Sequence, residues 1–584
     1  MNILGLSYMY HDSAACLLQD GAVVAAAAEE RFIRIKHSID FPLRALKYCL
    51  AEGGLSVGDL DGIVFYEKPF LKFERILKTH LMAFPRSYAS FRAFLPMWLN
   101  YKLSVPQTIR EETGYPGPVY FTDHHYAHAA SAFLPSPFER AIILTMDGTG
   151  EWSTTSHGVG EGTDIRLDQH QTFPHSLGLL YSAVTAHLGF KVNGGEGKVM
   201  GLASYGKPSF RRKFDQAVRI REDGSFQLNL DYFSFHYDLV MTNRKFAEHF
   251  CPPRAPESDI LPEHQDLAAS LQSVVEDAIL AMVRSLVARH GIDRLCIAGG
   301  VGLNCVANGL ILEDTPVREL FVQPAAGDDG ASLGAALYLD TLLGGGRDAV
   351  EAGGRASRSP SGGALAGRDR WRMRDAYLGP SFSDAEIEAF LRRSKWSYRE
   401  LTEDDLPARA AELLSRGRIV GWFQGRMEFG PRALGNRSIL ADPRDPKMKD
   451  ILNRRVKHRE PFRPFAPAVC VEDAPEYFAT SHESPFMLLS VPVREDKRGL
   501  IPSVVHVDGS ARLQTVSARS NPLFHRLIKE FGRRTGVPVV LNTSFNVRGE
   551  PIVCTPQDAV SSFLRTEMDD LLLHRFHLAK EDNR

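Results

Sequence analysis

The chain has 584 residues, 44% of them hydrophobic, with 69 basic and 71 acidic side chains and a formal net charge of −2. This length predicts two to four domains at roughly 150 residues each. The near-neutral balance gives no global attraction to nucleic acid or to a membrane surface, so no nucleic-acid partner is expected.

The N-terminus lacks the basic region and the long apolar core of a signal peptide. No apolar run reaches the roughly 18–20 residues that span a bilayer, so we expect no transmembrane segment. The seven cysteines are scattered, mostly within apolar runs, and form no Cys-x-x-Cys pair. This pattern is typical of reduced, buried thiols, and it predicts a cytoplasmic protein.

Two stretches share one strand-and-turn pattern. Residues 2–30 read as strand, turn, strand, an Asp20-Gly21 hairpin and a third strand. Residues 141–159 repeat it with a strand, an Asp147-Gly-Thr-Gly turn and a second, Ser- and Thr-rich strand. The repeat predicts a duplicated, two-lobed α/β fold with a nucleotide cleft between the lobes, as in the actin, Hsp70 and sugar-kinase superfamily.

Two histidines between these stretches suit a metal site. His124 and His128 are four positions apart, so on a helix they share a face, with side chains about 5–6 Å apart. They could grip one ion, and Asp147 at a strand end could add a carboxylate. Packing or hydrogen bonding is the alternative role for such a pair. His125 lies off the shared face and is expected to be a supporting or structural residue.

A glycine-rich loop follows further along the chain. A short strand, 295–298, leads into Gly299-Gly300-Val-Gly-Leu-Asn304, and a helix is expected from Cys305. Glycines between a strand and a helix let the backbone approach a nucleotide at the helix N-terminus. The Gly-Asp-Asp-Gly sequence at 327–330, before another predicted helix, reinforces this otherwise weak signal.

A Gly-, Ala-, Ser- and Arg-rich segment then divides the chain. Its composition buries little apolar surface and indicates a linker or a long surface loop. The predicted domains are therefore 1–345 and 370–584, joined by a linker at 346–369, and the second domain is also expected to be α/β.

The second domain carries a concentration of positive charge. Residues 416–463 hold thirteen Lys and Arg residues against five acids, interrupted by glycines and prolines. This pattern predicts a loop-lined anion pocket in which guanidinium groups bind phosphate oxygens. The alternatives are an ordinary charged surface and, because aromatic residues are interleaved, nucleic-acid binding. The neutral overall charge and the lack of a recognisable RNA-binding module disfavour the latter.

Taken together, these motifs resemble the NodU/CmcH-type O-carbamoyltransferases. The matching blocks span nearly the whole chain in order: 11–15, 29–37, 124–132, 197–203, 299–304, 425–467, 508–514 and 542–551. Residues 65–101 match weakly.

The resemblance implies a two-step enzyme. A YrdC-like C-terminal domain would make carbamoyl adenylate from carbamoyl phosphate and Mg-ATP. A TsaD-like N-terminal domain of the actin/Hsp70 superfamily would transfer the carbamoyl group to a hydroxyl of an acceptor such as a sugar, an antibiotic or a glycan. The rival functions are an actin-superfamily small-molecule kinase and a nucleotide-dependent RNA-binding protein.

The resemblance also implies roles for individual residues. The family's metal, usually iron(II), maps onto His124, His128, Asp147 and Asp328, with Asp329 as the alternative to Asp328. His11 maps onto the catalytic histidine, which suits a general base for an acceptor hydroxyl. The implied nucleotide-binding residues of the N-terminal domain are Lys36, Gly299, Gly300 and Asn304. The implied carbamoyl phosphate and ATP ligands of the C-terminal domain are Arg432, Lys457, Arg463, Arg512 and Ser544.

Residues 65–101 are rich in aromatic and basic side chains. One hypothesis is that they line the acceptor site or rest on a membrane that presents a lipid-linked acceptor. The alternative is a helical insert that simply packs on the N-terminal lobe.

Overall fold

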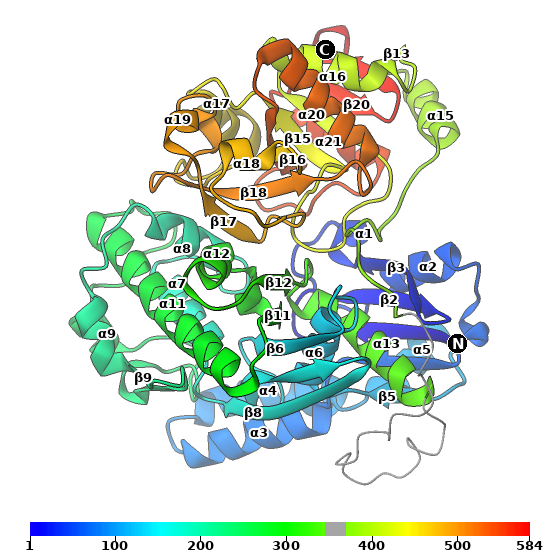
Figure 1. Ribbon diagram of the computed structural model, residues 1–584. Coiled ribbons are helices and arrows are strands. Elements are labelled where there is room, and N and C mark those ends of the chain that lie inside the picture. Colours follow the sequence, from blue (N-terminus) through cyan, green and yellow to red (C-terminus); the bar gives the residue numbers. More distant parts are fainter. Residues whose placement is uncertain (345–369, 584) are drawn as a thin grey trace. The chain divides into compact units, whose positions relative to one another are not determined.

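The computed structural model describes residues 1–344 and 370–583 and divides into two compact units (Figure 1). The first unit comprises Met1–Glu29 and His37–Met373, and the second comprises Glu30–Lys36 and Arg374–Arg584. The predicted linker, 346–369, lies outside the described residues, so the predicted domain boundary stays a prediction.

The first unit begins with a five-stranded sheet in the order β3-β2-β1-β4-β5. Strands β1 to β3 are antiparallel, whereas β4 runs parallel to β1 and β5 parallel to β4. Asp20 and Gly21 have positive φ values of 50° and 82°, which a two-residue turn of this kind requires, and the predicted hairpin is confirmed. The strands are β1 (Asn2–Ser7), β2 (Ala14–Gln19), β3 (Ala22–Ala28), β4 (Gly62–Phe65) and β5 (Val119–Phe121).

A second five-stranded sheet, in the order β12-β11-β6-β7-β8, repeats this design. Strands β6 to β8 are antiparallel, and β11 and β12 add in parallel on the other side of β6. The strands are β6 (Arg140–Met146), β7 (Ser153–Glu161), β8 (Asp164–Thr172), β11 (Arg294–Ala298) and β12 (Glu319–Val322). Two sheets with the same connectivity confirm the duplicated fold of the actin/Hsp70 superfamily.

Two helices pack against each other between these sheets (Figure 1). Helix α6 (His124–Phe133) lies on β6 and β11, and helix α13 (Asp328–Gly344) lies on β1 and β2. Their close approach depends on a missing side chain, because a Cβ on Gly334 would lie 1.8 Å from the Ala127 carbonyl oxygen. This contact brings the N-terminal turns of both helices to one place.

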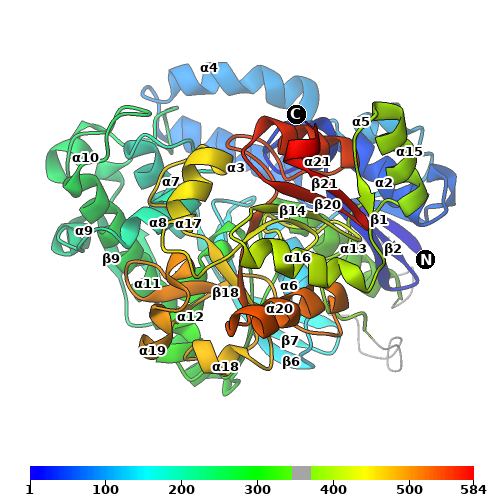
Figure 2. The same cartoon turned by 90° about the horizontal axis from the view of Figure 1, so that it is seen from above.

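The other elements of the first unit surround this core, and Figure 2 shows α4 at its periphery. A bilayer-spanning helix is absent from the described part of the chain. All seven cysteines are buried free thiols, as predicted. The remaining elements are α2 (Leu43–Glu52), α3 (Pro69–Met82), α4 (Tyr88–Met97), the π-helix η2 (Trp98–Lys102), α5 (Val105–Thr113), α7 (Leu177–His187), α8 (Glu196–Ala203), α9 (Arg211–Ala217), β9 (Val218–Ile220), β10 (Phe226–Leu228), α10 (Arg244–His249), α11 (Pro262–His290) and α12 (Cys305–Asp314).

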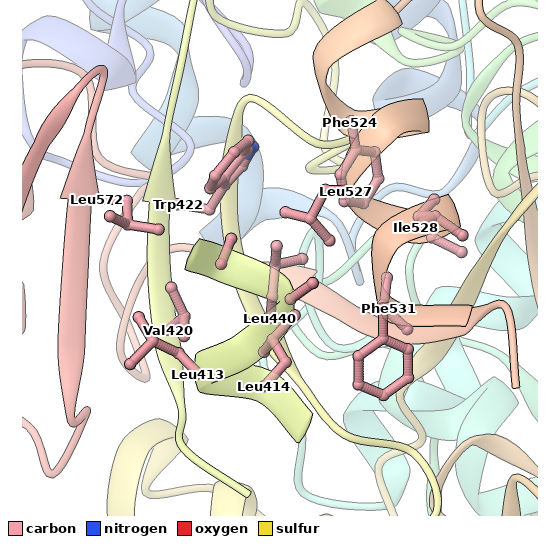
Figure 3. Close-up of a cluster of buried hydrophobic side chains, with 14 of the residues drawn as sticks. Leu413, Leu414, Val420, Trp422, Leu440, Phe524, Leu527, Ile528, Phe531 and Leu572 are labelled. Atoms are coloured by element: carbon pink, nitrogen blue, oxygen red, sulfur yellow. The ribbon is translucent and has the colours of Figure 1, made fainter. Parts of the chain in front are cut away.

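The second unit is built on a nine-stranded sheet in the order β13-β21-β20-β14-β15-β19-β16-β18-β17, which confirms the predicted α/β class. Helices α16 (Asp405–Ser415) and α20 (Pro522–Thr535) cover one face with apolar side chains around the buried Trp422 (Figure 3). The strands are β13 (Arg399–Glu400), β14 (Val420–Phe423), β15 (Arg437–Ala441), β16 (Ala466–Cys470), β17 (Leu489–Pro492), β18 (Ser510–Val516), β19 (Val539–Ser544), β20 (Asp570–Leu573) and β21 (Phe576–Ala579). The other helices are α15 (Asp384–Ser394), α17 (Met448–Ile451), the π-helix η5 (Leu452–Lys457), α18 (Ala474–Tyr477), α19 (Glu495–Arg498) and α21 (Pro556–Arg565).

The short segment Glu30–Lys36 belongs to this second unit despite its place near the N-terminus. It contains α1 (Glu30–Ile33). The Arg34 guanidinium donates to the carbonyl oxygens of Ile552, at 2.6 Å, and Pro551, at 2.8 Å. Phe32 packs against a small buried cluster that includes Ile552. The sequence order of this segment therefore does not indicate the unit with which it folds.

Candidate functional site

Four predicted metal ligands converge in the first unit. His124 and His128 come from the first two turns of α6, Asp147 follows β6 and Asp328 begins α13. The Nε2 atoms of the two histidines lie 3.1 Å apart, and Asp147 Oδ2 lies 3.3 Å from the nearer one. Asp328 Oδ1 is 3.5 Å from His128 Nε2. The two histidines of α6 and the aspartate after β6 thus lie together as the sequence predicted, and α13 supplies the fourth side chain.

This group could hold a metal ion. All four residues are buried, with His128 and Asp328 at most 1% exposed. Asp328 Oδ1 has no hydrogen-bond partner among the described residues, although a buried acceptor normally has one. Ligand atoms about 2.0–2.1 Å from one ion lie roughly 3.0–3.4 Å apart. The separations of 3.1 and 3.3 Å fall in this range, whereas those from Asp328 Oδ1 to the two histidines, 3.5 and 3.7 Å, are slightly longer. Imidazole and carboxylate donors suit several divalent transition metals, so the donor set fits iron(II) without fixing the identity.

The structure distinguishes Asp328 from Asp329. Asp328 points into the buried group, whereas the Asp329 carboxylate accepts a hydrogen bond from the Gly330 amide at 3.0 Å. His125 also lies off the group, with Nδ1 2.7 Å from Thr145 Oγ1. Burial and the two neighbouring histidines hold the pKa of His125 well below its ordinary value, so it is a neutral packing residue.

His11 lies beside this group and is held by a carboxylate. Its Nδ1 is 2.9 Å from Asp12 Oδ2, and its Nε2 is 3.7 Å from Asp328 Oδ2. The other Asp12 oxygen is 2.7 Å from His37 Nδ1, so two imidazoles flank one carboxylate. Burial alone would lower the pKa of His11, but Asp328, Asp12 and Asp147 outweigh it and raise that pKa to about 10. This excess of negative charge favours a bound cation.

The glycine loop contacts the same place. The Gly300 amide donates to Asp147 Oδ1 at 2.9 Å, and a Cβ on Gly299 would lie 2.2 Å from the Met146 carbonyl oxygen. Asn304 is the N-cap of α12 and accepts a hydrogen bond from the Ala307 amide at 3.2 Å. These contacts give the loop a structural role, and its predicted nucleotide binding stays a prediction.

Several residues at this site were missed by the sequence reasoning. Glu67 Oε2 lies 3.8 Å from His124 Nδ1, and Tyr66 donates from its hydroxyl to Asp328 Oδ2 at 3.4 Å. Glu151 accepts from the His124 amide at 3.1 Å. Such outer partners orient metal ligands. Tyr66 and Glu67 lie in the region of weak family resemblance, so no motif marked them.

The second unit holds Lys457 at the end of η5. Its ammonium donates to the Ser544 carbonyl at 2.7 Å and to the carbonyl and the Oδ1 of Asn546, both at 2.8 Å. Ser544 Oγ lies 3.3 Å from the same ammonium and donates to Asn546 Oδ1 at 2.7 Å. The side chain is only 3% exposed, and these hydrogen bonds fix the position of its ammonium group. Asn546 is a further site residue that was not predicted individually.

Other cations gather around Lys457. Burial, followed by the charges of Arg459, Arg463 and Lys36, lowers the pKa of its ammonium well below the ordinary value. Burial also lowers the pKa of Arg463, and the Arg512 charge adds to the effect although Glu460 opposes it. Like charges at short range repel one another unless an anion balances them.

The predicted C-terminal ligands are thus largely brought together. Lys457, Arg463, Arg512 and Ser544 belong to one region. Lys36 is part of the same unit, and its charge contributes to the lowered pKa of Lys457, while its predicted nucleotide-binding role stays a prediction. Arg432 lies in the loop between β14 and β15, and its role as a ligand stays a prediction.

Comparison with known proteins identifies the chain's relatives. It is 45% identical over 616 residues to an uncharacterized protein of Synechocystis sp., covering 99% of this chain and 97% of that protein. It is 40% identical over 585 residues to the nodulation protein NolNO of Sinorhizobium fredii, covering 98% of this chain and 79% of that protein. It is 37% identical over 267 residues to the 3'-hydroxymethylcephem-O-carbamoyltransferase of Amycolatopsis lactamdurans, covering 46% of this chain and 45% of that enzyme.

Two family models match, each on one part of the chain. Carbamoyltransferase N-terminus covers residues 2–337, and Carbamoyltransferase C-terminus covers residues 411–580. The first includes the buried histidine and aspartate group, and the second includes Lys457, Arg459 and Arg463. The chain therefore belongs to the carbamoyltransferase family.

Proposed function

We propose that the protein is an ATP-dependent O-carbamoyltransferase that works in two steps, one in each unit. The observation that carries the proposal is the pairing, in one carbamoyltransferase chain, of a buried cation cluster with a separate metal-type site beside a carboxylate-held histidine. The first feature suits anionic substrates and the second suits transfer to a hydroxyl.

In the first step the second unit, which would be YrdC-like, takes carbamoyl phosphate and Mg-ATP. Lys457, Arg463, Arg512, Ser544 and Arg432 would bind phosphate oxygens of both substrates. Because Lys457 is held by three oxygen acceptors, its charge is positioned before the substrates arrive. The acceleration then comes from positioning and charge neutralisation. Water cleaves carbamoyl phosphate to carbamate and phosphate, and a carbamate oxygen then attacks the α-phosphorus of ATP as the bond to pyrophosphate breaks. The products are carbamoyl adenylate, phosphate and pyrophosphate.

In the second step the first unit, which would be TsaD-like, binds the adenylate and an acceptor. A cation bound by His124, His128, Asp147 and Asp328 would offset the carboxylates that raise the pKa of His11 and so favour the neutral imidazole. His11 Nε2 then takes the proton of the acceptor hydroxyl while the hydroxyl oxygen attacks the carbamoyl carbon. The bond between that carbon and the phosphate oxygen breaks, and AMP leaves with the bonding electron pair. Asp12 holds the imidazole through Nδ1, so Nε2 faces the reacting group.

A divalent metal, of which iron(II) is our choice, would be held by His124, His128, Asp147 and Asp328. When bound, it supplies charge neutralisation at the adenylate phosphate and polarisation of the carbamoyl carbonyl. Lys36, Gly299, Gly300 and Asn304 are proposed nucleotide ligands, with Lys36 now assigned to the second unit's substrates.

The acceptor class is a hydroxyl-bearing small molecule or glycan. A related enzyme is named for carbamoylating a hydroxymethyl cephem, and other relatives are nodulation proteins. The name of the cephem enzyme supports a hydroxyl oxygen as the acceptor atom.

The deciding experiment uses iron-loaded protein with ATP and carbamoyl phosphate but no acceptor. Pyrophosphate and phosphate release are measured for wild type, Lys457→Ala and His11→Asn. We expect wild type and His11→Asn to release pyrophosphate only when carbamoyl phosphate is present, and Lys457→Ala to lose that release. Arg454→Ala is the matched control, because Arg454 is an exposed cation on the same π-helix as Lys457.

The outcomes separate the alternatives. If carbamoyl phosphate has no effect on ATP turnover, the carbamoyltransferase proposal is wrong and a small-molecule kinase becomes the better explanation. If His11→Asn loses the acceptor-independent release as completely as Lys457→Ala does, the assignment of the two steps to two units is wrong.

A further inference from the structure

The insert formed by α3 to η2 places two buried lysines near His11. Lys72 on α3 is 1% exposed, and Lys102 at the end of η2 is 8% exposed. Their ammonium groups lie 4.5 and 5.5 Å from the ring centroid of Tyr10. The Tyr10 ring in turn lies 5.2 Å from the His11 ring. The Tyr10 ring thus lies between the two lysines and the proposed catalytic histidine.

Only one of these two lysines is paired with a carboxylate. Lys72 donates to Glu67 Oε2 at 2.5 Å, so that pair is neutral. Among the described residues, Lys102 Nζ contacts the Tyr10 and Trp98 rings but has no hydrogen bond or ion pair. A buried ammonium normally has an anionic or hydrogen-bonding partner, because burial without one is costly. One positive charge is thus left for a ligand to balance.

The two lysines lie under a residue that borders solvent. Tyr10, which lies against both lysines, is 41% exposed. Burial lowers the pKa of Lys102 to about 8, with a further contribution from Lys72, and an anion placed beside it would reverse that effect.

We infer that Lys102, with Lys72 and Tyr10, forms a binding subsite for a carboxylate or phosphate group beside His11. The group is carried by the acceptor, next to the hydroxyl that is carbamoylated, or it is the nucleotide phosphate. The location beside His11 gains its meaning from the proposed function, whereas the anion binding itself does not depend on turnover.

Calorimetry on metal-loaded, full-length protein tests this without ATP or carbamoyl phosphate. Wild type and Lys102→Met are titrated with AMP and with glucose 6-phosphate, a probe that joins a phosphate to sugar hydroxyls. The cations of the second unit contribute equally to both proteins, so the difference reports the subsite. We expect the affinity for at least one probe to fall about 10- to 100-fold, the usual effect of losing a charged hydrogen bond.

Two further variants make the result specific. Lys102→Arg keeps the charge and should restore the affinity, and Lys78→Met removes an exposed lysine of α3 and should leave it unchanged. A loss confined to glucose 6-phosphate places the anion on the acceptor, and a loss for AMP places it on the nucleotide. Both results support the subsite.

The inference is overturned if Lys102→Met binds both probes within about twofold of wild type, including the case in which wild type binds neither. If Lys102→Met fails to fold, as judged by metal content and thermal unfolding, Tyr10→Leu replaces it, because Tyr10 is too exposed to be needed for folding. That variant should still weaken binding of one probe by at least about threefold. Carbamoyl phosphate-dependent pyrophosphate release is measured on the same preparations. Its absence with normal probe binding would count against the proposed function and not against the subsite.

Discussion

The two units carry opposite charges at their candidate sites. In the first unit, Asp147 and Asp328 approach two imidazoles, and the carboxylates raise the pKa of His11. In the second unit, burial and then the charges of Arg459 and Arg463 lower the pKa of Lys457. The charges of the first site suit a cation, and those of the second suit anions.

This difference explains why one chain needs both units. A site built to neutralise phosphates holds its substrates through positive charge, which does not help to remove a proton from a hydroxyl. A histidine held by a carboxylate provides a base, but it needs an activated carbamoyl group. The first two predictions act on the cation-binding site, and the last two act on the second unit.

The largest effect is expected from Asp328→Asn. Because changes to the residues behind metal ligands already cost 10- to 100-fold in affinity, losing a direct ligand should cost more than about 100-fold. Asp329→Asn is the control, since that neighbouring carboxylate bonds the Gly330 amide instead. Metal content and affinity are measured by mass spectrometry and competition with a chelator. Equal losses in both variants would contradict the assignment of Asp328.

A smaller effect is expected from Asp12→Asn. The amide keeps the shape of the carboxylate but removes the charge that orients His11, so kcat for carbamoyl transfer should fall about 10- to 100-fold, part of what a general base contributes. The KM for the acceptor and the acceptor-independent pyrophosphate release should stay near wild type. A change in KM alone would show that Asp12 acts in binding and not in positioning the base.

The cation-binding site was largely predictable because its signals are local. Two histidines four apart define a helix face, and Asp147 follows a strand that its own apolar run predicts. Asp328 lies far along the chain and came only from the family resemblance, since nothing local tells which helix packs against α6. Glu67 and Lys102 were not predictable, because only tertiary packing brings Glu67 beside His124 and Lys102 beside Tyr10.

The anion site shows a different limit of prediction from sequence. The density of cations in 416–463 predicted an anion pocket, and Lys457 and Arg463 do lie together. The family resemblance implied that Lys36 binds the nucleotide of the N-terminal domain, and this role stays a prediction. The structure groups Glu30–Lys36 with the second unit through side chains that carry no sequence signature, such as Phe32.

Lys457→Met tests whether ATP and the metal stabilise the protein through two separate sites. ATP at 100 times its Kd should stabilise wild type by about 2.7 kcal/mol, and Lys457→Met should lose most of that gain, whereas stabilisation by the metal should remain. Thermal unfolding with each ligand provides the measurement. Arg454→Met, which changes an exposed cation of the same helix, should keep both responses. Loss of the metal response in Lys457→Met would show that the two sites are not independent.

The smallest effect is expected from Arg34→Ala, which tests whether Glu30–Lys36 is part of the second unit. The change removes two hydrogen bonds to the Ile552 and Pro551 carbonyls and a 3.6 Å ion pair with Asp558. Because Arg34 is partly exposed, the second unit should lose about 1–2 kcal/mol of stability. Hydrogen exchange in peptides from β14 and β15 measures this loss of stability within the second unit.

The control for this last change is Lys47→Ala, an exposed lysine on α2 of the first unit. A surface substitution of that kind should shift stability by no more than about 0.5 kcal/mol. Metal affinity should be unchanged in both variants, since neither residue contacts the histidine and aspartate group. If Arg34→Ala instead loosened β1 and β2 while leaving β14 and β15 protected, the segment would belong to the first unit. Lys36 would then return to the nucleotide site that its sequence position first suggested.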